Sequence, residues 1–207
     1  IKMKLNEKAF ANALSILTAG FYFLFYILSF LTPPLFEFLF KAAHENPFLD
    51  WLIVFFATYL PYILGIAFLA LLFRFHRDWR KRVFVVIEAV LVSILSRGIV
   101  AEILHFLYLS PRPPAALGVN SLIFVPGNSF PSGHTSLLFG LATVVFYMNR
   151  RWGMWFFGLA FLNGLSRVVA GVHWPFDILG GAGVGIASGF LVHLLMRPHF
   201  GKFQSEN

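Results

Sequence analysis

The chain has 207 residues, of which 58% are hydrophobic and 12% are charged, and its mean hydropathy is +0.77. Soluble domains are about 45–50% apolar and about 25% charged, so this composition excludes an ordinary water-soluble fold, and it excludes disorder, which requires low hydrophobicity. The formal net charge is +7, and the absence of cysteine excludes disulfides, thiolate metal sites and cysteine nucleophiles.

Six apolar segments are long enough to cross a membrane. A membrane-spanning helix needs about 20 apolar residues, and in lipid every backbone polar group needs a partner within the structure. We therefore expect an all-α fold, with residues 1–207 forming a single membrane-embedded domain of six transmembrane helices. In chain order the expected spans are Phe10 to Leu31, Trp51 to Phe73, Val83 to Leu109, Ser132 to Met148, Trp152 to Val169 and Pro175 to Met196.

The segment at residues 35–50 is apolar but too brief to span a bilayer. Phe and Leu recur in it together with Glu37, Lys41 and Glu45. This mixture predicts a short helix that lies at the membrane interface.

Most of the Lys and Arg residues fall on one set of connections. They precede the first expected span, join the second to the third and the fourth to the fifth, and follow the sixth. Cytoplasmic connections carry an excess of Lys and Arg. We therefore expect a multi-pass cell-membrane protein with both termini in the cytoplasm. The net charge of +7 then reflects topology and gives no support to nucleic-acid binding.

The three outward connections carry the unusual polar residues. They are residues 110–114, residues 131–135 and residues 166–177. Ionisable groups at membrane depth are costly, which indicates function. Two arginines offer planar guanidiniums that match phosphate oxygens. The predicted start of a helix at Ser132 and Gly133 offers free backbone N–H groups to an anion.

Two histidines complete this set of polar residues. His173 and Asp177 are four residues apart, so at the start of a helix the carboxylate can hold the imidazole in one tautomer. A histidine can act as a nucleophile or as a general acid. Together with His134, this pattern predicts phosphoryl transfer to one histidine while the other protonates the leaving group. Each residue alone has an ordinary structural explanation, but their combination on one side favours a site.

The motifs resemble those of a known family. Pro131-Ser132-Gly133-His134 is similar to the central motif of the type 2 phosphatidic acid phosphatase family. Ser166-Arg167, five residues, His173, three residues and Asp177 resemble its third motif. Arg112-Pro113 resembles the end of its first motif. The order of the motifs, the six spans and the outward side also agree with this resemblance.

The resemblance implies a role for each motif residue. His173 would be the nucleophile that forms a phosphohistidine, and Asp177 would orient it. His134 would protonate the leaving oxygen and later activate the hydrolytic water. The family needs no metal ion and no cofactor. The residues expected to bind the phosphate are Arg112, Arg167, Ser132, Gly133 and His105.

His105 departs from the family pattern. The first motif usually begins with a lysine seven residues before its arginine, and this position is His105 here. Seven residues return to the same face of a helix, although Pro111 is expected to end the helix first. The change is expected to affect substrate preference or pH optimum. Arg97, within the third span, is expected to form a buried structural pair.

The resemblance implies hydrolysis of a lipid phosphate or diphosphate, and undecaprenyl-diphosphatase-like members fit the outward site best. The product would be undecaprenyl phosphate. Phosphatidylglycerol phosphate and phosphatidate are alternative substrates, and the expected partners are the phosphorylated lipid and membrane lipids. Two other classes stay open: a membrane transporter without hydrolase activity, and a metal hydrolase. The ligands of such a metal would be His134, His173, Asp177 and His105, but the neighbouring arginines would repel a cation.

Overall fold

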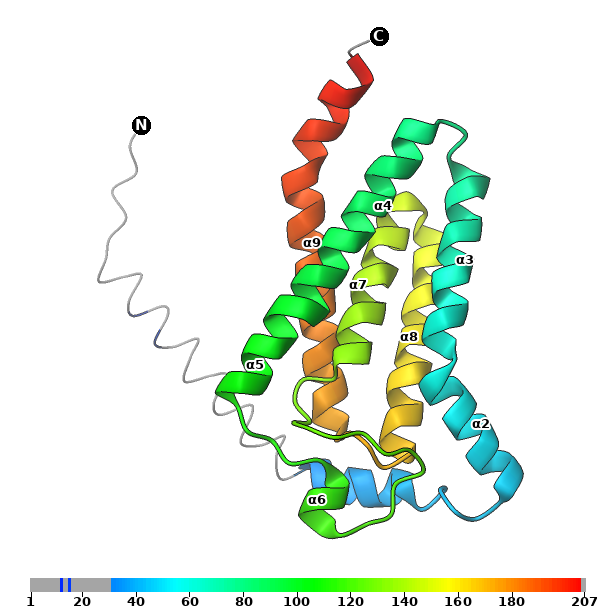
Figure 1. Cartoon of the computed structure of the whole chain (residues 1–207), viewed down its shortest axis with the longest axis vertical. Helices are drawn as coiled ribbons and strands as arrows, with labels where there is room; N and C mark the ends of the chain where they lie inside the picture. The colour runs from blue at the N-terminus through cyan, green and yellow to red at the C-terminus, as the bar shows by residue number, and fades with distance from the viewer. Residues whose placement is uncertain (1–11, 13–14, 16–30, 206–207) are drawn as a thin grey trace.

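The fold is an elongated bundle of helices (Figure 1). The computed structural model describes residues 12, 15 and 31–205, and every regular element among them is a helix. After a helix at Leu31–Phe40, the elements are α2 (Pro47–Thr58), α3 (Leu60–Phe75), α4 (Trp79–Ser93), the π-helix η1 (Ile94–Val100), α5 (Ala101–Leu107), α6 (Pro113–Leu117), α7 (Gly133–Met148), α8 (Arg150–Val169) and α9 (Pro175–Ser205).

The helix α7 lies in the middle of the bundle, where it contacts α3, α4, α8 and α9. Figure 1 shows the helix at Leu31–Phe40, α6 and the connections that precede α7 and α9 gathered at one end. The α3–α4 and α7–α8 connections lie at the opposite end. The bundle therefore has two chemically distinct ends, which hold different expected motifs.

Polar side chains set the starts of three helices. Asn46 accepts a hydrogen bond from the backbone N–H of Phe48 (2.8 Å) before α2. Asp78 and Asn149 cap α4 and α8 in the same way. Such caps satisfy N–H groups that have no partner within the helix. They fix where the chain re-enters the bundle after each connection.

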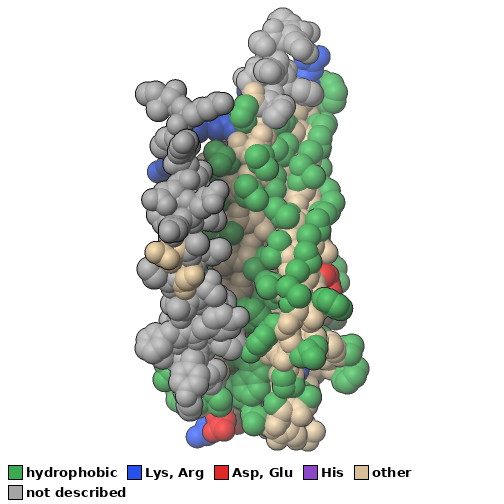
Figure 2. Space-filling model, turned by 90° about the vertical axis from the view of Figure 1, so that its left-hand side faces the viewer, with side chains coloured by type: hydrophobic (Ala, Val, Ile, Leu, Met, Phe, Trp, Pro, Cys, Tyr) green, Lys and Arg blue, Asp and Glu red, His purple; other side chains and the backbone are tan. Residues whose placement is uncertain are grey.

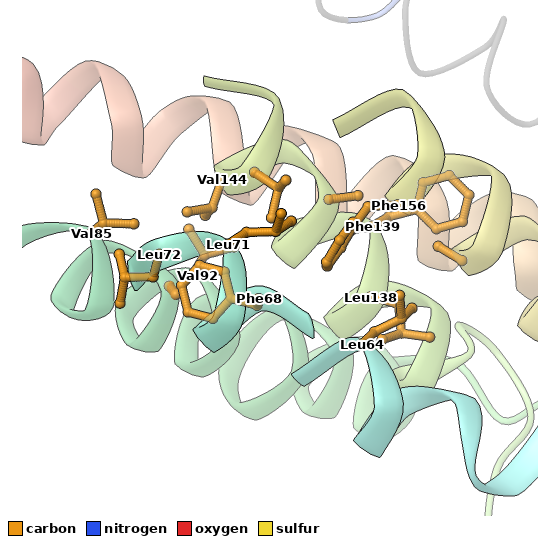
Figure 3. Packing of buried hydrophobic residues seen from close by; sticks show 14 of the residues in the cluster. Leu64, Phe68, Leu71, Leu72, Val85, Val92, Leu138, Phe139, Val144 and Phe156 are labelled. Carbon is orange, nitrogen blue, oxygen red and sulfur yellow. The ribbon is translucent and has the colours of Figure 1, made fainter. Parts of the chain in front are cut away.

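The main hydrophobic core lies between α3, α4, α7, α8 and α9. Figure 3 shows aliphatic and aromatic side chains from these helices packed against one another. In lipid the hydrophobic effect adds little between helices, so the dispersion contacts of close packing stabilise such a core. The labelled members are Leu64, Phe68, Leu71, Leu72, Val85, Val92, Leu138, Phe139, Val144 and Phe156.

The outer surface is also apolar. Large hydrophobic side chains are exposed along α2, α3, α4, α8 and α9, and Figure 2 shows them over the described part of one face along the bundle. By length and composition, the helices Trp79–Leu107 and Pro175–Pro198 can each cross a membrane. The bent pair α2–α3 is a third candidate if it forms one span.

The number of spans expected from the sequence is only partly accounted for. Most of the first expected span, Phe10 to Leu31, lies outside the described residues. α7 has 16 residues and is largely buried, with polar positions such as Ser136 and Thr143 facing its neighbours. α7 is apolar, but it is too short to be counted as a membrane span by itself.

The expected single helix over residues 35–50 is wrong. The described helix runs from Leu31 to Phe40 and includes Pro33 and Pro34, and residues 41–45 form turns and a bend before α2 begins at Pro47.

The second expected span, Trp51 to Phe73, is broken near its middle. α2 and α3 meet at Tyr59 with a bend of 49°. Pro61, in the first turn of α3, has no N–H to donate to the carbonyl of Ala57, and its ring would clash with that carbonyl in a straight helix. The bend leaves backbone carbonyls at the end of α2 free to accept other donors.

Candidate active site

A cavity of about 450 Å3 lies where α7 begins, at the end of the bundle that holds the three expected motifs. It gathers six of the eight residues expected to form the site: His105, Arg112, Gly133, His134, Arg167 and His173. Ser132 and Asp177 do not line it; both are buried behind it. Segments distant in sequence therefore meet around one volume large enough for a small anionic headgroup.

The imidazole of His173 is held from behind by a carboxylate. His173 Nδ1 lies 3.2 Å from Asp177 Oδ2, the contact expected for residues four apart at a helix start. Asp177 also accepts hydrogen bonds from the Ser129 hydroxyl and from the backbone N–H of Trp174 (2.7 Å). A proton on Nδ1 donates to Asp177, so Nε2 carries the free electron pair on the cavity side.

Burial decides the charge of this imidazole. His173 is 2% exposed, and desolvation lowers the pKa of His173 to about 4, although the hydrogen bond and the charge of Asp177 act to raise it. The imidazole is therefore neutral at physiological pH. A neutral imidazole is the form that can attack an electrophile.

Arg112 is fixed by three backbone carbonyls. Its guanidinium donates to Gly127 O (3.2 Å), Asn128 O (2.9 Å) and Val172 O (2.8 Å). One of its nitrogens lies 3.2 Å from His173 Nε2. Arg112 is therefore directed at the nitrogen that carries the free electron pair, where a bound phosphate oxygen would lie.

Arg167 reaches the cavity from α8 with support from the bend between α2 and α3. Its terminal nitrogen donates to the carbonyl of Ala57 (3.2 Å), and Asn163 donates to the same carbonyl (3.2 Å) and to Phe56 O (2.7 Å). Pro61 is the reason why the Ala57 carbonyl is available. Arg167 is 3% exposed, and its Nε finds no hydrogen-bond partner among the described residues. A buried N–H group without a protein acceptor is suited to bind an anionic ligand.

The start of α7 supplies the third part of the site. Gly133 is its first residue, and His134 is exposed to the cavity. Ser132 occupies the N-cap position, but its hydroxyl makes no capping bond to the described backbone and instead accepts from Thr135 (3.0 Å). A helix N-terminus carries partial positive charge and free N–H groups, so this end of the cavity also favours an anion.

His105 lies at the cavity but is already engaged. The helix ends at Leu107, so His105 and Arg112 do not share one helical face. His105 Nε2 lies 2.9 Å from the carbonyl of Pro131, and Nδ1 lies 3.8 Å from Glu102. These contacts tie His105 to the segment that enters α7 and leave Nε2 no free proton for a phosphate.

Three residues at the site were missed or misread from the sequence. Ser129 and Asn128 lie in the connection before α7, where Asn128 donates to His105 O (2.7 Å). Arg97 was expected to be buried, but its side chain is 42% exposed, lines the cavity and forms an ion pair with Glu102. The available signal was an arginine within an apolar span, which by default indicates function.

The arrangement suits metal-independent phosphoryl transfer. Three guanidiniums, a helix N-terminus and the imidazoles of His105, His134 and His173 surround one cavity, and groups of these kinds can bind an anion, attack phosphorus and donate a proton. The metal-hydrolase alternative has no geometric support, because no three His, Asp or Glu side chains in the described part of the chain are grouped to hold a metal ion.

The chain is similar to known proteins in sequence. The family model of the PAP2 superfamily matches residues 88–200. The chain is 33% identical over 159 residues to the bacitracin transport permease protein BcrC of Bacillus licheniformis, covering 76% of each chain. It is 32% identical over 170 residues to the undecaprenyl-diphosphatase BcrC of Bacillus subtilis, covering 77% of this chain and 85% of the relative.

A solved structure extends the similarity to three dimensions. The crystal structure of Aquifex aeolicus LpxE matches with a TM-score of 0.63 and 31% identity, covering 78% of this chain and 94% of that chain. The resemblance inferred from the motifs is confirmed, because the family match spans the second and third motifs. The chain therefore belongs to the PAP2 superfamily of membrane phosphatases.

Proposed function

We propose that this chain is a lipid diphosphatase that converts undecaprenyl diphosphate to undecaprenyl phosphate and inorganic phosphate. Relatives in two species are named undecaprenyl-diphosphatase at 30–32% identity, and membership of the PAP2 superfamily makes a lipid phosphate the substrate class. The observation that carries the proposal is the meeting of both imidazoles, His134 and His173, with Arg112 and Arg167 around one cavity.

The proposed reaction proceeds through a phosphohistidine. His173 Nε2 attacks the terminal phosphorus, and an N–P bond forms as the bond from that phosphorus to the bridging oxygen breaks. The bridging oxygen keeps the electron pair, and His134 donates a proton to it. His134 then takes a proton from water, whose oxygen attacks the phosphorus, and the N–P bond breaks to release inorganic phosphate.

The binding residues act on charge that develops in this reaction. Arg112 and Arg167 hold oxygens of the attacked phosphoryl group, together with N–H groups at Gly133. Asp177 keeps His173 in the reactive tautomer. We assign His105 and Ser132 supporting roles, because their polar atoms are bonded to Pro131 and Thr135.

The proposed setting is a six-span bundle formed by one domain over the whole chain. Its basic connections would face the cytoplasm and the cavity would face outward, near the lipid headgroups. The lipid tail would stay in the bilayer while the diphosphate enters the cavity. A panel that includes phosphatidylglycerol phosphate and phosphatidate separates the proposed substrate from the alternative lipids.

The test is phosphate release by the purified protein from undecaprenyl diphosphate. His173→Ala removes the nucleophile and is expected to abolish release, because the intermediate can no longer form at the imidazole that Asp177 orients. His134→Ala removes the acid and is expected to lower kcat by about 10²–10⁴-fold. Near-wild-type release by either variant would contradict the proposed mechanism.

A control histidine separates these effects from general damage. His44 lies outside the cavity, at a φ of 68°. Asparagine tolerates this left-handed conformation better than alanine, so His44→Asn is expected to retain activity. All three variants should elute as monodisperse protein with similar thermal unfolding.

Transport is the second candidate function, because one relative carries a transport name. A transporter would move its substrate without breaking a P–O bond. Phosphate release by purified protein in detergent, where no second compartment exists, supports the phosphatase. No release from any lipid of the panel would favour transport.

A further inference from the structure

Arg97 is a charged residue at the cavity that none of the three motifs contains. It lies in the π-helix η1, in the middle of the long helix Trp79–Leu107. A π-helical segment widens the turn and is frequent at functional sites. Here it accompanies a side chain that lines the cavity, is 42% exposed and is paired with Glu102. Glu102 thereby holds the guanidinium in place from one side.

The other side of this guanidinium rests on the start of α7. A Cβ atom built on Gly133 would lie 2.6 Å from Arg97 Cδ and 2.8 Å from its Cζ, and it would also overlap Nε. Gly133 has no side chain, so Arg97 can lie directly against the helix N-terminus. The guanidinium therefore lies against the residue that precedes His134 in the sequence.

Arg112 and Arg97 have different neighbours at the cavity. Arg112 lies 3.2 Å from His173 Nε2, on the side of the proposed nucleophile. Arg97 lies against Gly133, the residue before His134, which is the proposed acid. Phosphoryl transfer places the attacking and leaving atoms roughly in line on opposite sides of phosphorus. A group beside the acid therefore faces the leaving group.

We infer that Arg97 binds the lipid-linked phosphate of a diphosphate substrate and so selects diphosphates over monophosphates. This inference rests on the proposed function and adds a specificity residue to it. When the bond to the bridging oxygen breaks, the electron pair stays on the departing lipid monophosphate, whose negative charge increases. A guanidinium beside that phosphate stabilises the transition state more than the ground state.

A monophosphate substrate has no partner for this arginine. Its leaving oxygen is attached to carbon, so the position beside Arg97 holds no phosphate, and the interaction is lost. Arg97 therefore also accounts for a reaction that stops at the lipid monophosphate. The product would be a poor second substrate.

The test compares two substrates that share one tail, farnesyl diphosphate and farnesyl monophosphate, by their kcat/KM for phosphate release. Hydrogen bonds to a charged group are worth about 10- to 100-fold in rate when they are lost. Arg97→Gln is expected to lower kcat/KM for the diphosphate by about that factor and for the monophosphate by less than about threefold. The loss should fall mainly on kcat.

Two further variants keep the test decisive. Arg97→Lys retains the charge but loses the planar fork, so its diphosphate preference should lie between those of wild type and Arg97→Gln. It also carries the test if Arg97→Gln does not fold. Arg77→Gln removes an exposed arginine from the α3–α4 connection, at the other end of the bundle. It should leave kcat/KM unchanged for both substrates.

Equal losses for both substrates, or no loss for either, would overturn the inference. Either result would leave the phosphatase activity itself in place. A wild-type protein that releases phosphate from no lipid would instead remove the proposed function, and the inference with it.

Discussion

The nucleophile of the proposed reaction is a buried side chain that depends on its carboxylate partner. Asp177 is 1% exposed and receives bonds from Ser129, Trp174 and His173. As His173 Nε2 bonds to phosphorus, positive charge develops on the imidazole. Asp177 is the nearest group that can stabilise this charge, since Arg112 on the other side is positive.

Asp177→Asn tests this dependence. The amide keeps the size of the side chain but removes its charge, and it can present an N–H to Nδ1, which would favour the wrong tautomer. We expect kcat to fall on the order of 10³-fold with KM little changed. Because Asp177 acts to raise the pKa of His173, the pKa of His173 should fall further in the variant.

A distant cap provides the control for Asp177→Asn. Asp78 caps α4 at the opposite end of the bundle, and asparagine caps a helix about as well. Steady-state kinetics of Asp78→Asn should match those of wild type. An Asp177→Asn variant with kcat within threefold of wild type would show that the carboxylate does not support the nucleophile.

Spacing within motifs predicted the residues that now surround the cavity, because each motif sits at a helix end whose place follows from topology. His134, Arg167 and His173 are of this kind. Ser129 could not be predicted, since its contact with Asp177 depends on the course of an irregular connection. Arg97 was expected to be buried because the segment was treated as a regular α-helix. The apolar pattern gives no indication of the π-helical turn in which Arg97 lies.

At the scale of elements, the distance between α7 and α9 sets the distance between the two imidazoles. Glycines of α9 face α7: a Cβ on Gly185 would lie 2.7 Å from Gly140 N and would also overlap Ser136 O. The sequence alone left open whether these glycines serve packing or dimerisation. In the structure, Gly185 is buried against α7 within the chain.

Gly185→Ala is therefore expected to force α7 and α9 apart. The clash is with backbone atoms, which cannot move aside cheaply, and overpacking of this kind costs about 1–3 kcal/mol. The Tm in detergent should fall by about 5 °C, and phosphate release should fall as well. Gly183→Ala is the matched control, because nothing lies within 4 Å of a Cβ there. Equal Tm values for the two variants would contradict this packing.

The apolar segments of the sequence predicted the order of the helices. They did not predict where a helix is bent. The expected starts of α7 and α9 agree with the structure to within one residue. The bend between α2 and α3 was missed because Pro61 lies inside a continuous apolar segment. The hydropathy of a segment does not show that proline removes a backbone hydrogen bond. That bend has a direct use, since it frees the Ala57 carbonyl for Arg167.

At the scale of the whole molecule, basic connections and the cavity lie at opposite ends. Arg77 belongs to the α3–α4 connection, and the cavity lies at the end that carries α6 (Figure 1). If the basic end faces the cytoplasm, a lipid headgroup in the outer leaflet reaches the cavity directly. The orientation of the bundle thus decides which leaflet supplies the substrate.

The chain contains no cysteine, so single introduced thiols can report this orientation without background. Ala116 is exposed on α6, and Arg77 is exposed in the α3–α4 connection. In spheroplasts, a membrane-impermeant maleimide should label Ala116→Cys at once and Arg77→Cys only after permeabilisation. Both variants should first be shown to release phosphate at the wild-type rate. The reverse labelling pattern would place the cavity in the cytoplasm, and the substrate would then come from the inner leaflet.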